Sequence, residues 1–143
     1  MSVPETLLEI REHTGTGYLP LIDYGAWRVA VLRYIDELLP QDLVKMQRHL
    51  ETDEVFVLLS GRCILFLGEG DERVSSIHAQ DMEPLTLYNV KKRGWHTHTL
   101  STDATVLIVE NRDTASSNSS ETALDEGQRK RLIELTGRLW KSK

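Results

Sequence analysis

The sequence lacks the features that would place the protein outside the cell or in a membrane. Cys63 is the only cysteine among 143 residues, so no disulfide can form within one chain. No apolar run approaches the roughly 20 residues that a membrane-spanning helix needs. The first residues have neither the basic start nor the apolar core of a secretion signal. We therefore expect a soluble, cytoplasmic protein with no membrane partner.

Positive charge and phosphate-binding motifs are also scarce. The chain has 17 Lys and Arg residues against 22 Asp and Glu residues, a formal net charge of -5. Nucleic-acid binding needs a concentrated basic surface, and the basic run at residues 91–93 is typical of a solvated turn. Neither a glycine-rich phosphate loop nor a serine nucleophile elbow is present. We expect no nucleic-acid partner and take a small molecule as the expected ligand.

What is present is enough apolar sequence for one globular domain, arranged in short stretches. Apolar residues make up 40% of the chain and charged residues 27%. Between Tyr18 and Glu110, short runs rich in Val, Leu and aromatic residues alternate with turns. We count about eight strands, at spacings typical of a β-sandwich or barrel. One hairpin spans residues 54–67, where Gly61 is free to take the positive φ of a tight turn. The sequence predicts an all-β fold.

The end of the chain follows a different pattern. Residues 113–122 are polar and rich in Ser, Thr and Asn, as in a linker. Apolar residues then recur at helical spacing from Leu124 to Trp140, which predicts a C-terminal α-helix. We divide the chain into a β domain of residues 1–112, the linker, and a helical segment of residues 123–143. The apolar stripe of the helix packs on its own domain or on a partner subunit, and we expect a homodimer.

Two separated stretches carry side chains that can bind a metal ion. Gln47 and His49 are two residues apart on a predicted strand and so point the same way, and Glu54 opens the next strand. His96 and His98 are likewise two residues apart on a later strand. Imidazole, carboxylate and amide oxygen suit a divalent ion. Opposed strands would form a His-Glu-His centre with Gln47 as a possible fourth ligand. The spacing leaves open whether His96 or His98 completes it.

Each of these residues also has a common structural role. A single strand histidine is most often exposed or hydrogen-bonded, and Glu54 taken alone is an ordinary strand-end carboxylate. Cys63 lies in an apolar strand, where a thiol usually serves as a small core residue. Only the combination of residues favours a metal site over these roles.

The stretch from His49 to Gly61 resembles the first motif of the cupin superfamily. That motif is a His-x-His pair followed, after three or four residues, by Glu and then, after six more, by Gly. Here His49, Glu54 and Gly61 match the second His, the Glu and the Gly, while Gln47 stands in place of the first His. The resemblance covers about residues 27–110.

A second stretch is similar to part of the second cupin motif. Gly94 and His96 match its Gly and its His, while Lys92 replaces a Pro and Leu100 replaces an Asn. The resemblance implies a double-stranded β-helix, or jelly-roll, barrel whose mouth holds Mn, Fe, Ni or Zn. In the family this ion is often held by two or three histidines and the glutamate, and some members have lost the metal.

Three functional hypotheses follow. The first is a single-domain, metal-binding cupin that acts on or binds a small polar or carboxylated metabolite, with His49, Glu54, His96 and Gln47 as ligands. The second is a metal-free cupin that binds a ligand or holds structure without catalysis, because Gln47 occupies a histidine position. The third is an interaction module that dimerises through edge strands or the C-terminal helix. The sequence does not decide whether the protein is an enzyme.

Overall fold

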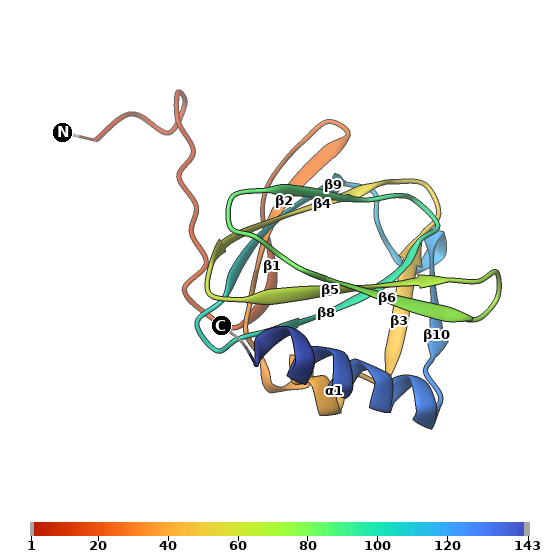
Figure 1. Cartoon of the computed structure of the whole chain (residues 1–143). Helices are drawn as coiled ribbons and strands as arrows, with labels where there is room; N and C mark the ends of the chain where they lie inside the picture. The colour runs from red at the N-terminus through yellow and green to blue at the C-terminus, as the bar shows by residue number, and fades with distance from the viewer. Residues whose placement is uncertain (1, 142–143) are drawn as a thin grey trace.

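The computed structural model describes residues 2–141, which form two five-stranded antiparallel sheets and one α-helix (Figure 1). Sheet A contains, in spatial order, β1 (Gly17–Tyr24), β2 (Trp27–Arg33), β9 (Thr105–Asn111), β4 (Glu54–Ser60) and β7 (Leu87–Val90). Sheet B contains β10 (Ser119–Ala123), β3 (Lys45–His49), β8 (Trp95–Leu100), β5 (Cys63–Glu69) and β6 (Ser76–Asp81). The helix, α1, spans Glu126–Trp140, and 3-10 turns lie at Asp36–Leu38, Pro40–Asp42 and Ser116–Asn118.

The predicted all-β fold with a C-terminal helix is confirmed. Among the described residues, no hydrogen-bonded ladder joins sheet A to sheet B, so the sheets are not closed into a barrel. None of the helices in this part of the chain is long and apolar enough to cross a membrane.

The main core lies between the two sheets. Side chains alternate between the two faces of a strand, and β9 shows this plainly, because Val106 and Ile108 are buried whereas Leu107 and Val109 are only partly covered. Cys63 is fully buried in the same core, and burial raises the pKa of its thiol. The core members are Ala30, Leu32, Phe56, Leu58, Cys63, Leu65, Met82, Val90, Leu100, Ala104, Val106 and Ile108.

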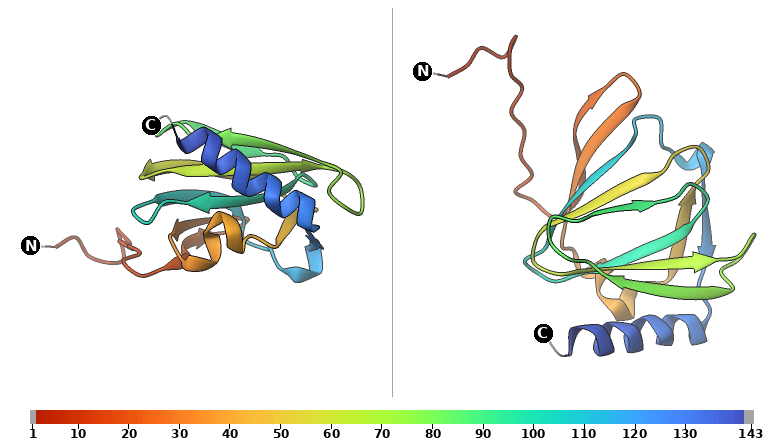
Figure 2. Two further views of the ribbon diagram at one scale, coloured as in Figure 1. Left: turned by 60° about the horizontal axis from the view of Figure 1, so that its bottom comes forward. Right: turned by 45° about the horizontal axis from the view of Figure 1, so that its top comes forward.

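A second core lies between sheet B and α1, which packs on the outer face of that sheet (Figure 2). The helix begins after a capping box, in which the Asp125 side chain accepts a hydrogen bond from the Gln128 backbone and the Gln128 side chain accepts one from the Asp125 backbone. Leu132 and Leu135 are buried against the sheet. The helix therefore uses its apolar stripe within its own chain. The predicted helical segment extended to residues 142–143, which lie outside the described residues.

The polar segment 113–122 contains regular backbone structure. Its last residues belong to β10, which pairs with β3 from Ser119 opposite His49 to Ala123 opposite Lys45. The pairing supplies hydrogen-bond partners to a strand that meets β8 at only one residue pair, Gln47 opposite His96. The side chain at position 49 is thus fixed by a strand from the far end of the chain.

The predicted hairpin over residues 54–67 is wrong, because β4 pairs with β7 and β9 whereas β5 pairs with β6 and β8. The predicted turn at Gly61 is confirmed. Its φ is +73°, and a Cβ at this position would lie 2.5 Å from the Cα of Ala104. Only glycine combines this backbone conformation with so close an approach. The turn carries the chain from β4 in sheet A to β5 in sheet B.

Candidate metal centre

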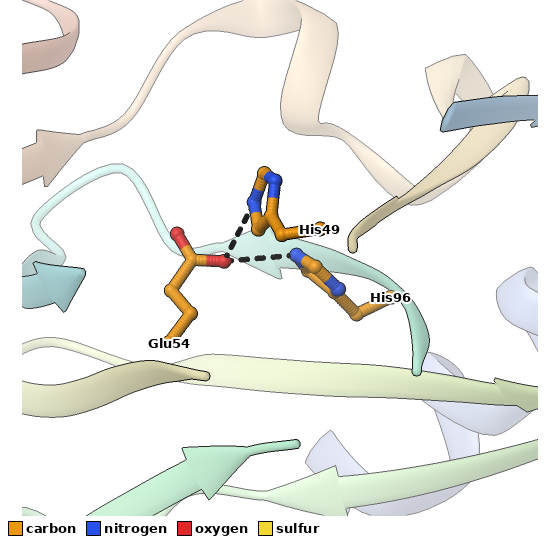
Figure 3. A group of neighbouring side chains, drawn as sticks. All are labelled: His49, Glu54 and His96. Atoms are coloured by element: carbon orange, nitrogen blue, oxygen red, sulfur yellow. Dashed lines mark ion pairs between the residues drawn. The ribbon is translucent and has the colours of Figure 1, made fainter. Parts of the chain in front are cut away.

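Three elements bring His49, Glu54 and His96 together between the sheets (Figure 3). His49 ends β3, Glu54 begins β4, and His96 follows the first residue of β8. The three residues are 7%, 5% and 1% exposed, respectively. The structure thus places these sequence-predicted candidates side by side, with His96 rather than His98 next to the carboxylate.

The ligand atoms of the three residues converge on one point. Oε1 of Glu54 lies 3.2 Å from Nε2 of His49 and 2.9 Å from Nε2 of His96, and the ligand atoms all lie within 4.8 Å of one another. Two ligands about 2.1 Å from an ion stand about 3.0 Å apart in an octahedral site and about 3.4 Å apart in a tetrahedral one. The separations along both edges that meet at Glu54 are therefore those of a metal site.

The remaining nitrogen of each histidine is held from outside the cluster. Nδ1 of His96 donates to the carbonyl oxygen of Gly94 at 3.0 Å, and Nδ1 of His49 lies 2.8 Å from Oγ of Ser119. An imidazole that donates from Nδ1 carries its lone pair on Nε2 when neutral. Such a bond fixes the ring orientation of a metal ligand.

Buried polar atoms in the cluster remain without hydrogen-bond partners. The Nε2 atoms of His49 and His96 lie at ion-pair distance from Oε1 of Glu54, and all three atoms are buried without an assigned hydrogen bond. A lone pair on Nε2 that faces a carboxylate oxygen is repulsive unless a cation lies between them. A proton or a metal ion can fill that role, so the residues present fit a divalent metal.

The electrostatics of the cluster favour a charged carboxylate. Burial pushes the pKa of Glu54 upward, but the two facing imidazoles outweigh burial and leave it well below its usual range. The pKa of His49 is raised, chiefly by its contact with Glu54, with a smaller contribution from the charge of Glu110. An anionic oxygen beside two imidazoles matches the donor set that a divalent transition metal prefers.

His98 and Gln47 lie outside the three-residue cluster but on the same cavity. The His98 ring packs 5.9 Å from the Phe56 ring, and burial lowers the pKa of His98 to about 4. Gln47 is exposed and lines the cavity near His49. Both side chains therefore face the space in which a ligand would sit.

That space is a cavity of about 370 Å³ between the sheets. One wall is apolar and includes Leu32, Ile35, Leu38 and Ile108. Next to it lies a second hollow of about 470 Å³ whose lining includes the hydroxyls of Thr114, Ser116 and Ser119. Because Gln47, His49 and Thr114 line both, the two hollows adjoin at the candidate centre.

Sequence reasoning missed three polar residues that line this cavity. The Tyr18 hydroxyl donates to Oε1 of Glu110 at 2.7 Å, and Nη1 of Arg28 lies 3.7 Å from the same oxygen. Oε2 of Glu110 lies 3.9 Å from Nε2 of His49. The sequence did contain a signal for Glu110. Strand alternation places it after Val106 and Ile108 on the core face of β9, where a carboxylate is unusual.

Burial raises the pKa of Glu110, and the nearby charge of Glu54 raises it further. Burial also raises the pKa of the Tyr18 hydroxyl, and its hydrogen bond to Glu110 raises that pKa further. Two carboxyl groups at the cavity thus have opposite tendencies, since Glu54 loses its proton readily and Glu110 retains its proton more readily.

We expect the two cavity histidines of the metal-free protein to titrate in different pH ranges. His98 should stay neutral down to about pH 4, and His49 should titrate above its ordinary value. Below about pH 6.5, the unfolded His98 binds a proton that the folded ring does not, so through this residue the free energy of unfolding falls as the pH decreases toward 4. NMR titration of the imidazole carbons tests this. A His98 that titrates at or above its ordinary value would contradict it.

Neither a protein-family model nor a curated protein matches the sequence. Solved structures share its fold. Pac13, described as a nucleoside dehydratase, matches with a TM-score of 0.55 and 7% identity over 81% of this chain and 87% of that chain. A Streptomyces PAC13 variant with uridine matches with a TM-score of 0.56 and 8% identity over 81% of this chain and 86% of that chain. A cupin-2 domain protein from Shewanella frigidimarina has a TM-score of 0.47 and 15% identity over 72% of this chain and 85% of that chain.

At these identities the likeness extends to the fold alone. The fold that the chain shares with Pac13 agrees with the cupin fold that the resemblance in the sequence implies. A buried His-Glu-His group that can hold a divalent metal lies inside that fold.

Proposed function

We propose that the protein binds one divalent transition metal, Zn, Mn, Fe or Ni, through His49, Glu54 and His96, and a small polar or carboxylated metabolite beside it. The main support for this proposal is that three buried ligand atoms without hydrogen-bond partners converge on one point. Three protein ligands leave positions open, as a catalytic site requires. When bound, the metal supplies a Lewis acid or an oxygen-binding centre. Gln47, at the edge of the cavity, is a candidate fourth ligand.

The other cavity residues would bind and orient the metabolite. Nε of Arg28 is buried without a hydrogen-bond partner, and its guanidinium can bind a carboxylate. The apolar wall on the opposite side excludes water from the bound molecule. Glu110 would present Oε2, the oxygen nearer His49, to the metabolite, while Tyr18 donates to Oε1. The cavity thus combines an anion-binding group with a second carboxyl group.

Reconstitution with metal tests the proposal. Protein stripped with a chelator and reloaded is expected to retain about one equivalent of one of the four metals. His49→Ala should retain less than about 0.1 equivalent because it removes a ligand, whereas His98→Gln, which leaves the three-residue cluster intact, should retain the full amount. Equal loss in both variants, or no retention by the unaltered protein, would contradict the proposal.

A metal-free ligand-binding protein is the second candidate. Gln47 occupies a position where the cupin motif has histidine, and a proton alone can satisfy the facing lone pairs of the cluster. Structures of PAC13 variants contain uridine, and the hydroxyl-rich hollow beside the apolar wall would suit a nucleoside. Binding of uridine by chelator-treated protein in calorimetry would favour this candidate, and the unchanged affinity of His49→Ala would distinguish it from the first.

With either candidate function, we also propose three features that the sequence predicts. The two sheets would have the jelly-roll arrangement without closing into a barrel, the protein would function in the cytoplasm, and it would do so as a homodimer. The division into residues 1–112, 113–122 and 123–143 likewise stays a prediction.

A further inference from the structure

The hollow beside the main cavity has a different chemistry from the cavity itself. Besides His49 and Ala115, its lining consists of hydroxyl, amide and carboxylate side chains, those of Gln47, Thr114, Ser116, Ser119 and Glu121. Within the described part of the chain, no large apolar side chain lines it, whereas the cavity has an apolar wall. Hydroxyl and amide groups both donate and accept hydrogen bonds. The hollow therefore suits a portion of a ligand whose groups also do both, as alcohol groups do.

The charged groups at the two ends of this connected space differ in sign. In the hollow, the charged side chain is Glu121, which pairs with Lys45, and among the described residues no lysine or arginine belongs to the lining. At the other end, Arg28 lines the cavity. Nη1 of Arg28 lies 3.7 Å from Glu110, and its Nε is buried without a hydrogen-bond partner. A ligand carboxylate is therefore attracted to the Arg28 end, and uncharged polar groups fit the other.

One wall of the hollow is the loop between β9 and β10, and Asn118 holds it in shape. Nδ2 of Asn118 donates to the carbonyl oxygen of Asp113 at 2.7 Å, and its Oδ1 accepts from the backbone N–H of Ala115 at 2.9 Å. The carbonyl oxygen of Asn118 accepts from the N–H of Leu50 at 2.9 Å. Ser116 is exposed on this loop, and its hydroxyl has no hydrogen-bond partner among the described residues. The wall is thus preorganised, with one hydroxyl available to a ligand.

We propose that the metabolite is a hydroxylated carboxylic acid, such as a sugar acid, whose carboxylate faces Arg28 and whose hydroxylated end lies against Ser116. This inference rests on the metabolite site of the proposed function and names its substrate class. Gln47, His49 and Thr114 line both the cavity and the hollow, so a ligand that spans the two passes directly beside the candidate centre. Ser116 is then a specificity-determining residue, because it favours ligands that carry hydroxyl groups at the end away from Arg28.

A set of probes that carry one or both kinds of group tests the proposal. D-glucuronate and D-galacturonate have a carboxylate and hydroxyl groups, D-glucose has the hydroxyl groups alone, and hexanoate has the carboxylate alone. In calorimetry, at least one of the two sugar acids should bind about tenfold more tightly than glucose or hexanoate, since each partial probe lacks one set of hydrogen bonds. Each titration is made with chelator-treated and with metal-reloaded protein.

Two substitutions at opposite ends of the space should affect different probes. Ser116→Ala should weaken sugar-acid binding about three- to tenfold, the loss of one hydrogen bond, and leave hexanoate unchanged. Ser120→Ala is the matched control, because Ser120 lies on β10 and does not line the hollow. Arg28→Gln should weaken the sugar acids and hexanoate alike, and Arg28→Lys, which keeps the charge, should weaken them less. Denaturant unfolding of each variant confirms that the fold is retained.

The results separate this inference from the proposed metal site, because metal content is measured independently. If the protein retains metal but binds neither sugar acid more tightly than hexanoate, the inference is wrong and the metal site stands. An equal effect of Ser116→Ala and Ser120→Ala would also overturn it, as would tighter binding of uridine than of either sugar acid. If the protein retains no metal but shows the expected differences among probes and variants, the metal site is wrong and the assigned ligand class stands.

Discussion

Replacing Glu54 with Gln is expected to lower the free energy of unfolding of the metal-free protein by about 3 kcal/mol near pH 6. Glutamine keeps the volume of the side chain but removes the charge that faces His49 and His96 at 3.2 and 2.9 Å. Removing one partner of a buried pair leaves the other uncompensated in a site of low polarity. The variant should also lose at least about a hundredfold in metal affinity, because the carboxylate is the anionic ligand of the cluster.

The loss of stability caused by Glu54→Gln should become smaller as the pH rises. Since the contact with Glu54 raises the pKa of His49, this pair contributes stability that is fully present below the unfolded value of about 6.5 and is lost as the pH rises through the folded value. Glu54→Gln should therefore be most destabilising near pH 6 and less so near pH 9. Chemical denaturation at both pH values measures this.

Glu110→Gln is the matched control for this experiment. Glu110 is equally buried in the same cavity, but its pKa is raised, and a glutamine oxygen can still accept from the Tyr18 hydroxyl. Glu110→Gln should lower the free energy of unfolding by about 1 kcal/mol or less. If both variants were equally destabilised at both pH values, the carboxylate of Glu54 would have no special relation to the histidines.

Trp95→Ala is expected to destabilise the protein by about 3–5 kcal/mol, the cost of a large buried side chain replaced by a cavity. Trp95 is 1% exposed in the core between sheet B and α1. Its indole N–H donates to the carbonyl oxygen of Gly70 at 3.0 Å, and the Arg48 guanidinium lies 4.3 Å from the ring centroid. Because Trp95 directly precedes His96 on β8, the variant should also weaken metal binding.

The same substitution at Trp27 provides the control. Trp27 is 45% exposed at the start of β2, so Trp27→Ala should cost about 1 kcal/mol or less. Denaturant unfolding of both variants at one low protein concentration keeps association out of the comparison. Equal losses would mean that the core under α1 contributes little to stability.

The fold was largely predictable because its elements have strong local signals. The turn at Gly61 joins two apolar runs that both form strands, and α1 has a clear helical period. The pairing of those two strands was not predictable, because they enter opposite sheets. β10 could not be predicted, since the segment Ser119–Ala123 is polar and forms a strand only because β3 offers it a free edge. Pairing of this kind depends on residues far away in sequence, and no local pattern records it.

The candidate site was predictable in outline only. Strand alternation places His96 and His98 on one face, and it cannot distinguish them. Tertiary structure does so, because Nε2 of His96 lies 2.9 Å from Oε1 of Glu54 while His98 lies further along β8, outside the three-residue cluster. Arg28 and Tyr18 join the cavity from strands that lack any motif, and their contribution depends on which sheet their strands enter.

The attachment of β3 also affects how the protein is synthesised. Every residue of β3 pairs with β10, and the ring of His49 contacts Ser119, which lies 70 residues later in the chain. At about 5–20 residues per second, a ribosome needs about 4–14 s to make that interval. During this time the nascent chain carries His49 and Glu54 without the strand that fixes the imidazole. A polypeptide cut short before residue 119 would contain all three candidate ligands but not the strand that pairs with β3.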